Sequence, residues 1–284
     1  MNIVTTTSVF PPCYSPQRAI ERLASCGFRH LDLAFDYLVQ QEDFPFMTDA
    51  WEDWANELSA FAKARGVRYT HAHAEGDVAE HGEIMRRCFE VCRILGISHM
   101  VIHPICRDEN GQPIDDVDRF VTVNAEAVRP LLAHAERCGV TILSENLFWG
   151  ASIYPSSLSA LVEAVDSPYF GWCYDTGHAH AFDLAPDELI GLKHPPLSLH
   201  MQDNHGMGKD RHGKDEHLMP GDGTMDWKRF LEVLHEIGYR GELVLEAHHQ
   251  SLDAPDEQRE EILSELYSRA EKLNRAYCAM KKRS

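Results

Sequence analysis

The chain has 284 residues, of which 44 % are hydrophobic and 25 % are charged, and this length fits one α/β barrel. Both fractions are close to average globular usage, so they exclude a mainly disordered or fibrous protein. The formal net charge of -18 disfavours a nucleic-acid partner, because such binding depends largely on Lys and Arg that neutralise phosphates.

Short apolar runs alternate with amphipathic segments along the whole chain. Eight runs are predicted strands, at residues 2–6, 30–35, 68–74, 99–103, 141–146, 171–175, 197–202 and 242–247. Helix-like sequence with a period of about 3.6 residues follows each run, which is typical of parallel βα units. Because no linker divides them, the units predict a single-domain (β/α)8 TIM barrel over residues 1–284. An open doubly wound sheet is the alternative.

One predicted connection, at residues 203–224, is much longer than the others and follows the seventh strand. Such βα connections usually have about two to six residues. Long ordered loops in compact domains are often lids or binding loops. We therefore expect this loop to lie over the C-terminal mouth of the barrel.

Six of the eight predicted strands end in His, Asp or Glu, and the carboxyl ends of barrel strands converge on one mouth. A lone Asp there is usually a helix cap, and a lone His is usually a core residue. Carboxylates on apolar strands are costly to bury unless a cation pairs with them. Together the residues predict a metal site of three carboxylates and one imidazole: Glu145, Asp175, His200 and Glu246. This set suits Mn²⁺, Mg²⁺ or Co²⁺, and the histidine also admits Zn²⁺.

These positions resemble the xylose-isomerase-like superfamily, which includes sugar isomerases, sugar epimerases and enzymes of the endonuclease IV type. The resemblance covers essentially the whole chain. Its motifs are SEN at 144–146, DTGH at 175–178, HMQD at 200–203, PGDGTMDW at 220–227 and VLE at 244–246. Each motif is short, and their order on successive strands makes the combination specific.

The isomerase and epimerase branch implies that Glu145, Asp175, His200 and Glu246 are the metal ligands. It also implies that Glu145 and Glu246 exchange a proton with the carbon next to a substrate carbonyl. His178 is similar in position to a histidine that contacts a substrate oxygen. The expected activity is isomerisation or epimerisation of a sugar, sugar phosphate or polyol, and a dehydratase would begin with the same proton abstraction.

The nuclease branch implies a multinuclear zinc site instead, and therefore a phosphoesterase or nuclease. Plausible matches to its additional ligands are His73, His103, His178, Asp215 and His217. His71 competes with His73, and the Asp210-Arg211-His212 segment repeats the Asp-x-His pattern of Asp215 and His217. The acidic net charge counts against a nuclease. A carbohydrate-binding barrel without activity is a third alternative.

Further side chains near the mouth are candidate substrate contacts. These are His73, His103, Arg211 and the aromatic residue Trp149; Tyr37 lies near another strand end. Aromatic faces commonly stack on sugars, although simple packing is an equal alternative, and arginine binds phosphate or carboxylate. Because the chain has no P-loop or GxGxxG motif, we expect no nucleotide cofactor.

The remaining expectations concern location and partners. The segment MNIVTTTSVF lacks the features of a signal peptide, and no stretch approaches the roughly 18 apolar residues of a membrane span. The eight cysteines form no CxxC pair, which suits a reducing compartment. We therefore expect a cytoplasmic enzyme with a small-molecule sugar or polyol substrate and no membrane contact. The apolar helix faces permit a homo-oligomer.

Overall fold

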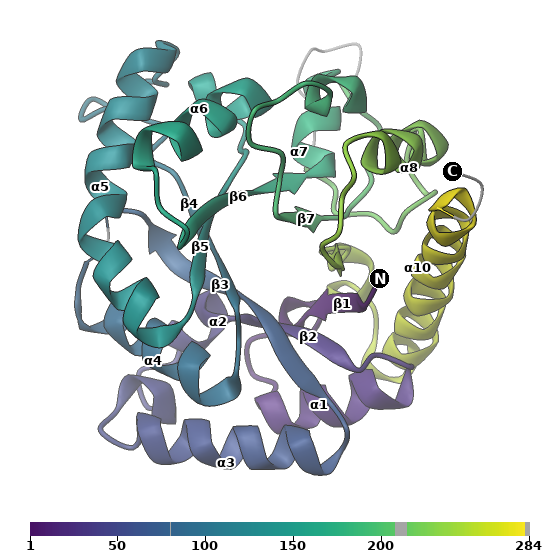
Figure 1. The fold of residues 1–284 in the computed structure, drawn as a ribbon. Coiled ribbons are helices and arrows are strands. Elements are labelled where there is room, and N and C mark those ends of the chain that lie inside the picture. Colours follow the sequence, from purple (N-terminus) through teal and green to yellow (C-terminus); the bar gives the residue numbers. More distant parts are fainter. Residues whose placement is uncertain (80, 208–214, 282–284) are drawn as a thin grey trace.

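The computed structural model describes residues 1–79, 81–207 and 215–281. Its eight strands pair in parallel in the order β7-β6-β5-β4-β3-β2-β1-β8. The strands are β1 (Ile3–Thr6), β2 (His30–Ala34), β3 (Arg68–Asp77), β4 (His99–His103), β5 (Thr141–Glu145), β6 (Phe170–Asp175), β7 (Ser198–His200) and β8 (Leu243–Leu245). Figure 1 shows them as a ring surrounded by helices.

Backbone hydrogen bonds continue the ring between its first and last members. The Met201 amide donates to the Val244 carbonyl at 2.7 Å, and the Glu246 amide donates to the Met201 carbonyl at 3.1 Å. Met201 and Leu245 form a parallel bridge there. The barrel is therefore nearly closed, and the predicted (β/α)8 class is confirmed.

The predicted strands are all present, with differences at their ends. β3 runs to Asp77 rather than to residue 74, because Asp77 pairs with His103 of β4 after a shift in register. β7 and β8 end earlier than predicted. Among the described residues, the pairing of these two segments past β7 is a single bridge between Met201 and Leu245, which is too short to extend either strand.

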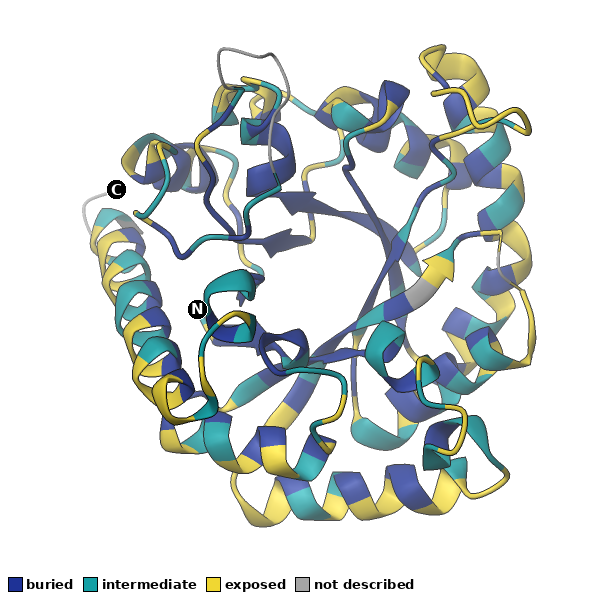
Figure 2. Cartoon of the chain, turned by 180° about the vertical axis from the view of Figure 1, so that it is seen from behind, coloured by how far each residue is buried: buried dark blue, intermediate teal, exposed yellow. Residues whose placement is uncertain are grey.

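Helices surround the ring, and short helical turns follow several strands. The α-helices are α1 (Pro16–Ser25), α2 (Phe35–Val39), α3 (Trp51–Ala64), α4 (Glu83–Leu95), α5 (Val117–Cys138), α6 (Pro155–Val165), α7 (Thr176–His180), α8 (Trp227–Glu236), α9 (His249–Leu252) and α10 (Arg259–Lys281). Figure 2 shows strands that are mostly buried and helices with exposed outer faces. Of the helices in the described part of the chain, none is long and apolar enough to cross a membrane.

Local sequence explains where helix α5 begins and ends. The Asp116 carboxylate accepts a hydrogen bond from the Arg119 amide at 2.7 Å, so it caps the first turn of α5. Gly139 ends α5 with a φ of 68°, a left-handed conformation that glycine adopts without steric cost.

Alternation along the strands directs the polar strand ends to the interior of the barrel. Val101, Leu143 and Cys173 form a buried cluster separate from the main core between strands and helices. Residues two apart share a face of a strand. His103, Glu145 and Asp175 therefore lie on the same inner face, one step closer to the C-terminal mouth.

Candidate active site

Four side chains from the ends of neighbouring strands meet at the mouth of the barrel. Glu145 ends β5, Asp175 ends β6, His200 ends β7 and Glu246 directly follows β8. One ligand atom of each lies within 4.8 Å of those of the others. His200 Nδ1 lies 2.8 Å from Glu145 Oε1 and 3.3 Å from Glu246 Oε2. The fold therefore brings together all four residues that were predicted as metal ligands.

The quartet of Glu145, Asp175, His200 and Glu246 fits a divalent metal ion. All four residues are buried, and the most exposed is Glu246 at 8 %. Glu145 Oε2 and Asp175 Oδ2 are buried oxygens with no hydrogen-bond partner among the described residues. An unpaired buried carboxylate oxygen is costly, and a bound cation removes that cost.

Negative charge is crowded at this position, as the pKa shifts show. Burial raises the pKa of Asp175 to about 7, and the charges of Glu145 and Glu246 add to the rise although His178 opposes it. Burial alone would lower the pKa of His73, but Glu246 and Glu145 raise it to about 9. Such crowding favours binding of a cation.

Asp175 also has the structural role that a strand-end aspartate usually has. Its Oδ1 accepts a hydrogen bond from the His178 amide at 2.7 Å and so caps α7. The Asn146 side chain holds the backbone of Asp175, accepting from its amide at 2.7 Å and donating to its carbonyl at 3.1 Å. Because Oδ1 is the atom that caps the helix, Oδ2 remains available to a metal ion held by the quartet.

A second group of possible ligands adjoins the quartet through Glu145. It consists of His73, His103 and Glu145. His73 Nε2 lies 3.1 Å from His103 Nε2, which in turn lies 3.5 Å from Glu145 Oε2. His71 instead contacts Ser198 Oγ at 3.0 Å. Of the two competing histidines of β3, His73 is therefore the one that the fold brings to the quartet.

A third group comes from α7 and the described end of the long loop. It consists of His178, Asp215 and His217. Asp215 Oδ2 lies 2.7 Å from His217 Nε2 and 3.7 Å from His178 Nε2. His217 Nδ1 lies 2.8 Å from the Glu246 carbonyl, and its φ of 43° is one that non-glycine residues seldom adopt. The competing Asp210 and His212, and the candidate Arg211, lie outside the described residues.

A cavity of about 190 Å³ opens beside Glu246, His73 and His103. Its lining includes Asp36 and His248, which sequence reasoning did not identify as site residues. Their positions just past strand ends could have identified them. Asp36 lies two residues after the end of β2, and His248 lies two residues after Glu246.

The aromatic candidate Trp149 does not line this cavity. It is 42 % exposed, and the Arg107 guanidinium stacks 3.7 Å from the centre of its ring. Its neighbour Phe148 contacts the His178 ring, with 4.1 Å between ring centres. Phe148 is thus in contact with His178 of the site.

Residues 20–268 match the family described as xylose isomerase-like TIM barrel. The fold and the arrangement of acidic and imidazole groups agree with this match, and the chain belongs to this family. The resemblance found in the sequence is therefore confirmed.

Curated relatives cover different shares of the chain. D-psicose 3-epimerase of Ruminiclostridium cellulolyticum is 25 % identical over 246 residues, which are 80 % of this chain and 76 % of that protein. Protein y4fM of Sinorhizobium fredii is 24 % identical over 202 residues, or 67 % of this chain. MJ1311 of Methanocaldococcus jannaschii is 29 % identical over 170 residues, or 58 % of this chain. The chain spans 62 % and 55 % of the lengths of the latter two proteins.

Solved structures share the whole fold. The IolI protein with a bound zinc atom has a TM-score of 0.75 at 18 % identity, with 98 % of both chains covered. The 3-keto-D-glucoside 4-epimerase YcjR of E. coli has a TM-score of 0.68 at 18 % identity, with 94 % of this chain and 99 % of that chain covered. These likenesses establish the barrel fold.

Proposed function

We propose that this protein is a metal-dependent isomerase or epimerase of a small sugar or related polyol. The observation that carries the proposal is that Glu145 and Glu246 both approach His200 Nδ1, at 2.8 and 3.3 Å, in one buried group. Family membership and the relationship to D-psicose 3-epimerase support this class of reaction.

Glu145, Asp175, His200 and Glu246 would hold the metal ion. When bound, Mn²⁺, Mg²⁺, Co²⁺ or Zn²⁺ would draw electron density from the substrate carbonyl and make the neighbouring C–H group more acidic. Such a cation also offsets the cost of burying three carboxylates.

The two glutamates would move the proton. Burial opposes ionisation of Glu145 and Glu246, but the charge of His200 outweighs it and holds both pKa values well below the ordinary value. Both are therefore ionised and able to accept a proton. Glu145 ends β5 and Glu246 follows β8, three positions away in the ring, so they would approach a substrate from different strands. One would remove the proton and the other would return it.

His178 would contact a substrate oxygen. Its Nδ1 lies 2.7 Å from the Asn146 carbonyl oxygen, which can only accept a hydrogen bond. Nδ1 therefore carries the proton in the neutral ring, and Nε2 is the atom left for another partner. The same bond fixes the orientation of the ring.

Substitution of Glu246 by Gln tests the proton-transfer role. We expect kcat on a panel of ketoses to fall by about 10²–10⁴-fold, the usual contribution of a general acid or base. Proton NMR in D₂O would show that wild type exchanges the hydrogen next to the carbonyl and that the variant does not. Glu236→Gln, on the exposed side of α8, is the matched control. Full activity of Glu246→Gln would exclude this role.

A second candidate function is a multinuclear zinc phosphoesterase. The specific observation in its favour is that the groups His73–His103–Glu145 and His178–Asp215–His217 lie beside the quartet. The first group shares Glu145 with the quartet, and His178 Nδ1 of the second lies 3.7 Å from Glu145 Oε1. Ligand groups this close together suit metal ions that act together on a phosphoryl group.

Metal content and phosphatase activity separate the two functions. Elemental analysis of wild type, Glu145→Ala and His217→Ala would give the number of metal ions per chain, with His235→Ala on α8 as the control. About one equivalent, lost in Glu145→Ala and kept in His217→Ala, supports the isomerase. Two or three zinc ions, fewer in His217→Ala, together with release of phosphate from a generic ester, support the phosphoesterase.

A further inference from the structure

The cavity beside Glu246 contains polar side chains to which proton transfer assigns no role. Asp36 and Tyr37 line it from the first turn of α2, and Ser8 lines it from the 3₁₀ turn η1 (Thr7–Val9). Its volume of about 190 Å³ is below the roughly 300–1,000 Å³ of pockets for drug-sized ligands. The cavity therefore suits a ligand the size of a monosaccharide.

Apolar anchors set the orientation of α2. Phe35 and Leu38 are buried, and the Phe35 ring packs against Phe46 with 5.3 Å between ring centres. Asp36 and Tyr37 occupy the intervening positions, are half-buried and line the cavity. A pair held by a packed helix turn is preorganised to bind a ligand.

Charge limits which ligand this cavity accepts. Its lining contains the carboxylates of Asp36 and Glu246, and the described residues that line it include no Lys or Arg. His73 also lines the cavity, but its Nδ1 is already paired with Glu246 Oε1 at 3.5 Å. A phosphate there would face the Asp36 carboxylate without a guanidinium or ammonium partner. Sugar hydroxyls can donate to a carboxylate, and they can both donate to and accept from a tyrosine hydroxyl.

We infer that Asp36 and Tyr37 form a hydroxyl-binding subsite that selects an unphosphorylated polyhydroxy substrate. Asp36 accepts hydrogen bonds from hydroxyls remote from the reacting carbonyl, and Tyr37 binds a neighbouring hydroxyl. This inference rests on the proposed function, because it assumes that the substrate reacts at the end of the cavity next to Glu246.

Steady-state kinetics of the Mn²⁺-loaded full chain test the subsite, with D-fructose and fructose 6-phosphate as probes. Wild type is expected to have a kcat/KM at least tenfold higher for the free sugar. Asp36→Ala should raise KM for D-fructose about tenfold or more, as for loss of a hydrogen bond to a charged group, and change kcat far less. Asp36→Asn keeps an acceptor oxygen and should recover part of the loss.

Two further variants separate binding from folding. Tyr37→Phe removes only a hydroxyl and should raise KM severalfold. Asp43→Ala, in the exposed segment after α2, should leave KM unchanged. An unchanged KM in both Asp36→Ala and Tyr37→Phe, or a wild-type preference for fructose 6-phosphate, would overturn the inference.

Binding without turnover distinguishes failure of this inference from failure of the proposed function. Absence of turnover by wild type on every ketose would count against the proposed function alone. In that case, the increase in unfolding temperature on addition of D-fructose measures binding and tests whether the subsite exists. Tenfold weaker D-fructose binding by Asp36→Ala supports it, whereas equal binding by wild type and variant refutes it.

Discussion

Asp175 shows how one side chain can serve both folding and a site. Its Oδ1 caps α7 at 2.7 Å from the His178 amide, whereas its buried Oδ2 has no hydrogen-bond partner among the described residues. A cap alone does not require a negative charge, since an Asn oxygen accepts the same bond. The charge of Asp175 is therefore a cost to the metal-free fold and an advantage only when a cation is bound.

Asp175→Asn should therefore stabilise the metal-free protein and weaken metal binding. The pKa of Asp175 is raised from 3.8 to about 7, chiefly by burial, so ionisation favours the unfolded state as pH rises between these values. The stability advantage of the variant should be absent near pH 4, grow towards pH 7 and then level off. Urea unfolding with a chelator present, over pH 4–8, measures it. Equal stability of the variant and wild type throughout would contradict the prediction.

At the scale of elements, one buried aspartate organises the long connection after β7. The Asp203 carboxylate accepts hydrogen bonds from the Gly221 amide at 2.8 Å, the Met225 amide at 3.2 Å and the Trp227 indole at 2.8 Å. Its backbone pairs with Leu218 through two bonds of 2.9 Å. Because both ends of the connection are tied to this residue, Asp215 and His217 are held near His178.

Asp203→Ala should destabilise the protein by roughly 2–4 kcal/mol, the cost of leaving several donors to a buried carboxylate unpaired. It should also lower metal occupancy at the group formed by His178, Asp215 and His217. Chemical denaturation and zinc titration of the same samples measure the two effects. Asp253→Ala, at an exposed position after α9, is the control. An unfolding free energy within experimental error of wild type would show that the loop is held by other contacts.

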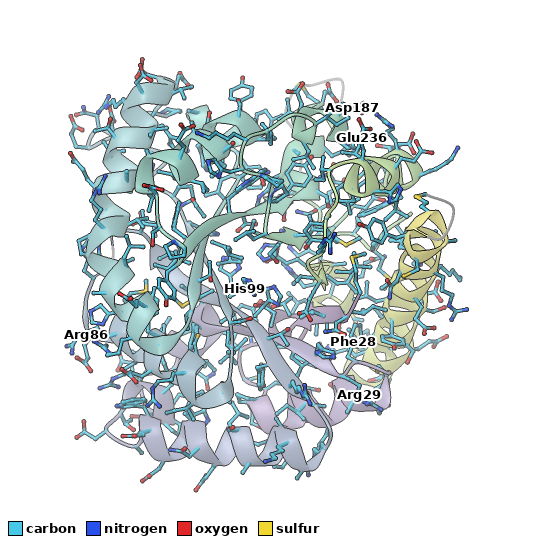
Figure 3. The ribbon with its side chains drawn as sticks, viewed as in Figure 1. Phe28, Arg29, Arg86, His99, Asp187 and Glu236 are labelled. Carbon is cyan, nitrogen blue, oxygen red and sulfur yellow. The ribbon has the colours of Figure 1, made fainter. Side chains whose placement is uncertain are left out.

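At the scale of the whole molecule, the barrel has an acidic mouth and also a polar group at its N-terminal end. This group, called the floor here, consists of Glu242, Thr70, His71 and His99. Glu242 accepts a hydrogen bond from Thr70 Oγ1 at 2.7 Å and lies 3.3 Å from His71 Nδ1. The His71 ring stacks on that of His99, with 5.1 Å between centres. Figure 3 shows His99 within the ring of strands, whereas Arg86 and Glu236 lie at the periphery. This floor is separate from the quartet.

The floor should make folding sensitive to acid. Burial would raise the pKa of Glu242, but hydrogen bonds from His71, Asn2 and Thr70 lower it from 4.5 to about 2. Its contribution to stability is therefore complete above about pH 4.5 and is lost as pH falls towards 2. Between about pH 4.5 and pH 2, the free energy of unfolding should fall by about 3 kcal/mol more in wild type than in Glu242→Gln. Identical pH profiles of the variant and wild type would refute the assignment.

The sequence by itself determined the eight βα units, the inner face of each strand and the acidic and imidazole residues at the strand ends. These features are local, because alternation along a strand decides which face a side chain occupies. Successive strands end in Glu145, Asp175 and His200. This pattern predicts that the three side chains meet at one mouth of the barrel. The family resemblance followed from the same short motifs in order.

Only the tertiary structure decided which of these residues meet and how closely. Register between strands places His73 beside His103 and leaves His71 near Glu242. Anchoring of the long connection brings Asp215 to His178, and packing of α2 turns Asp36 into the cavity. Distances of this kind depend on the register of the whole ring and on loop anchors far along the chain. These distances cannot be inferred from residue patterns within a short segment.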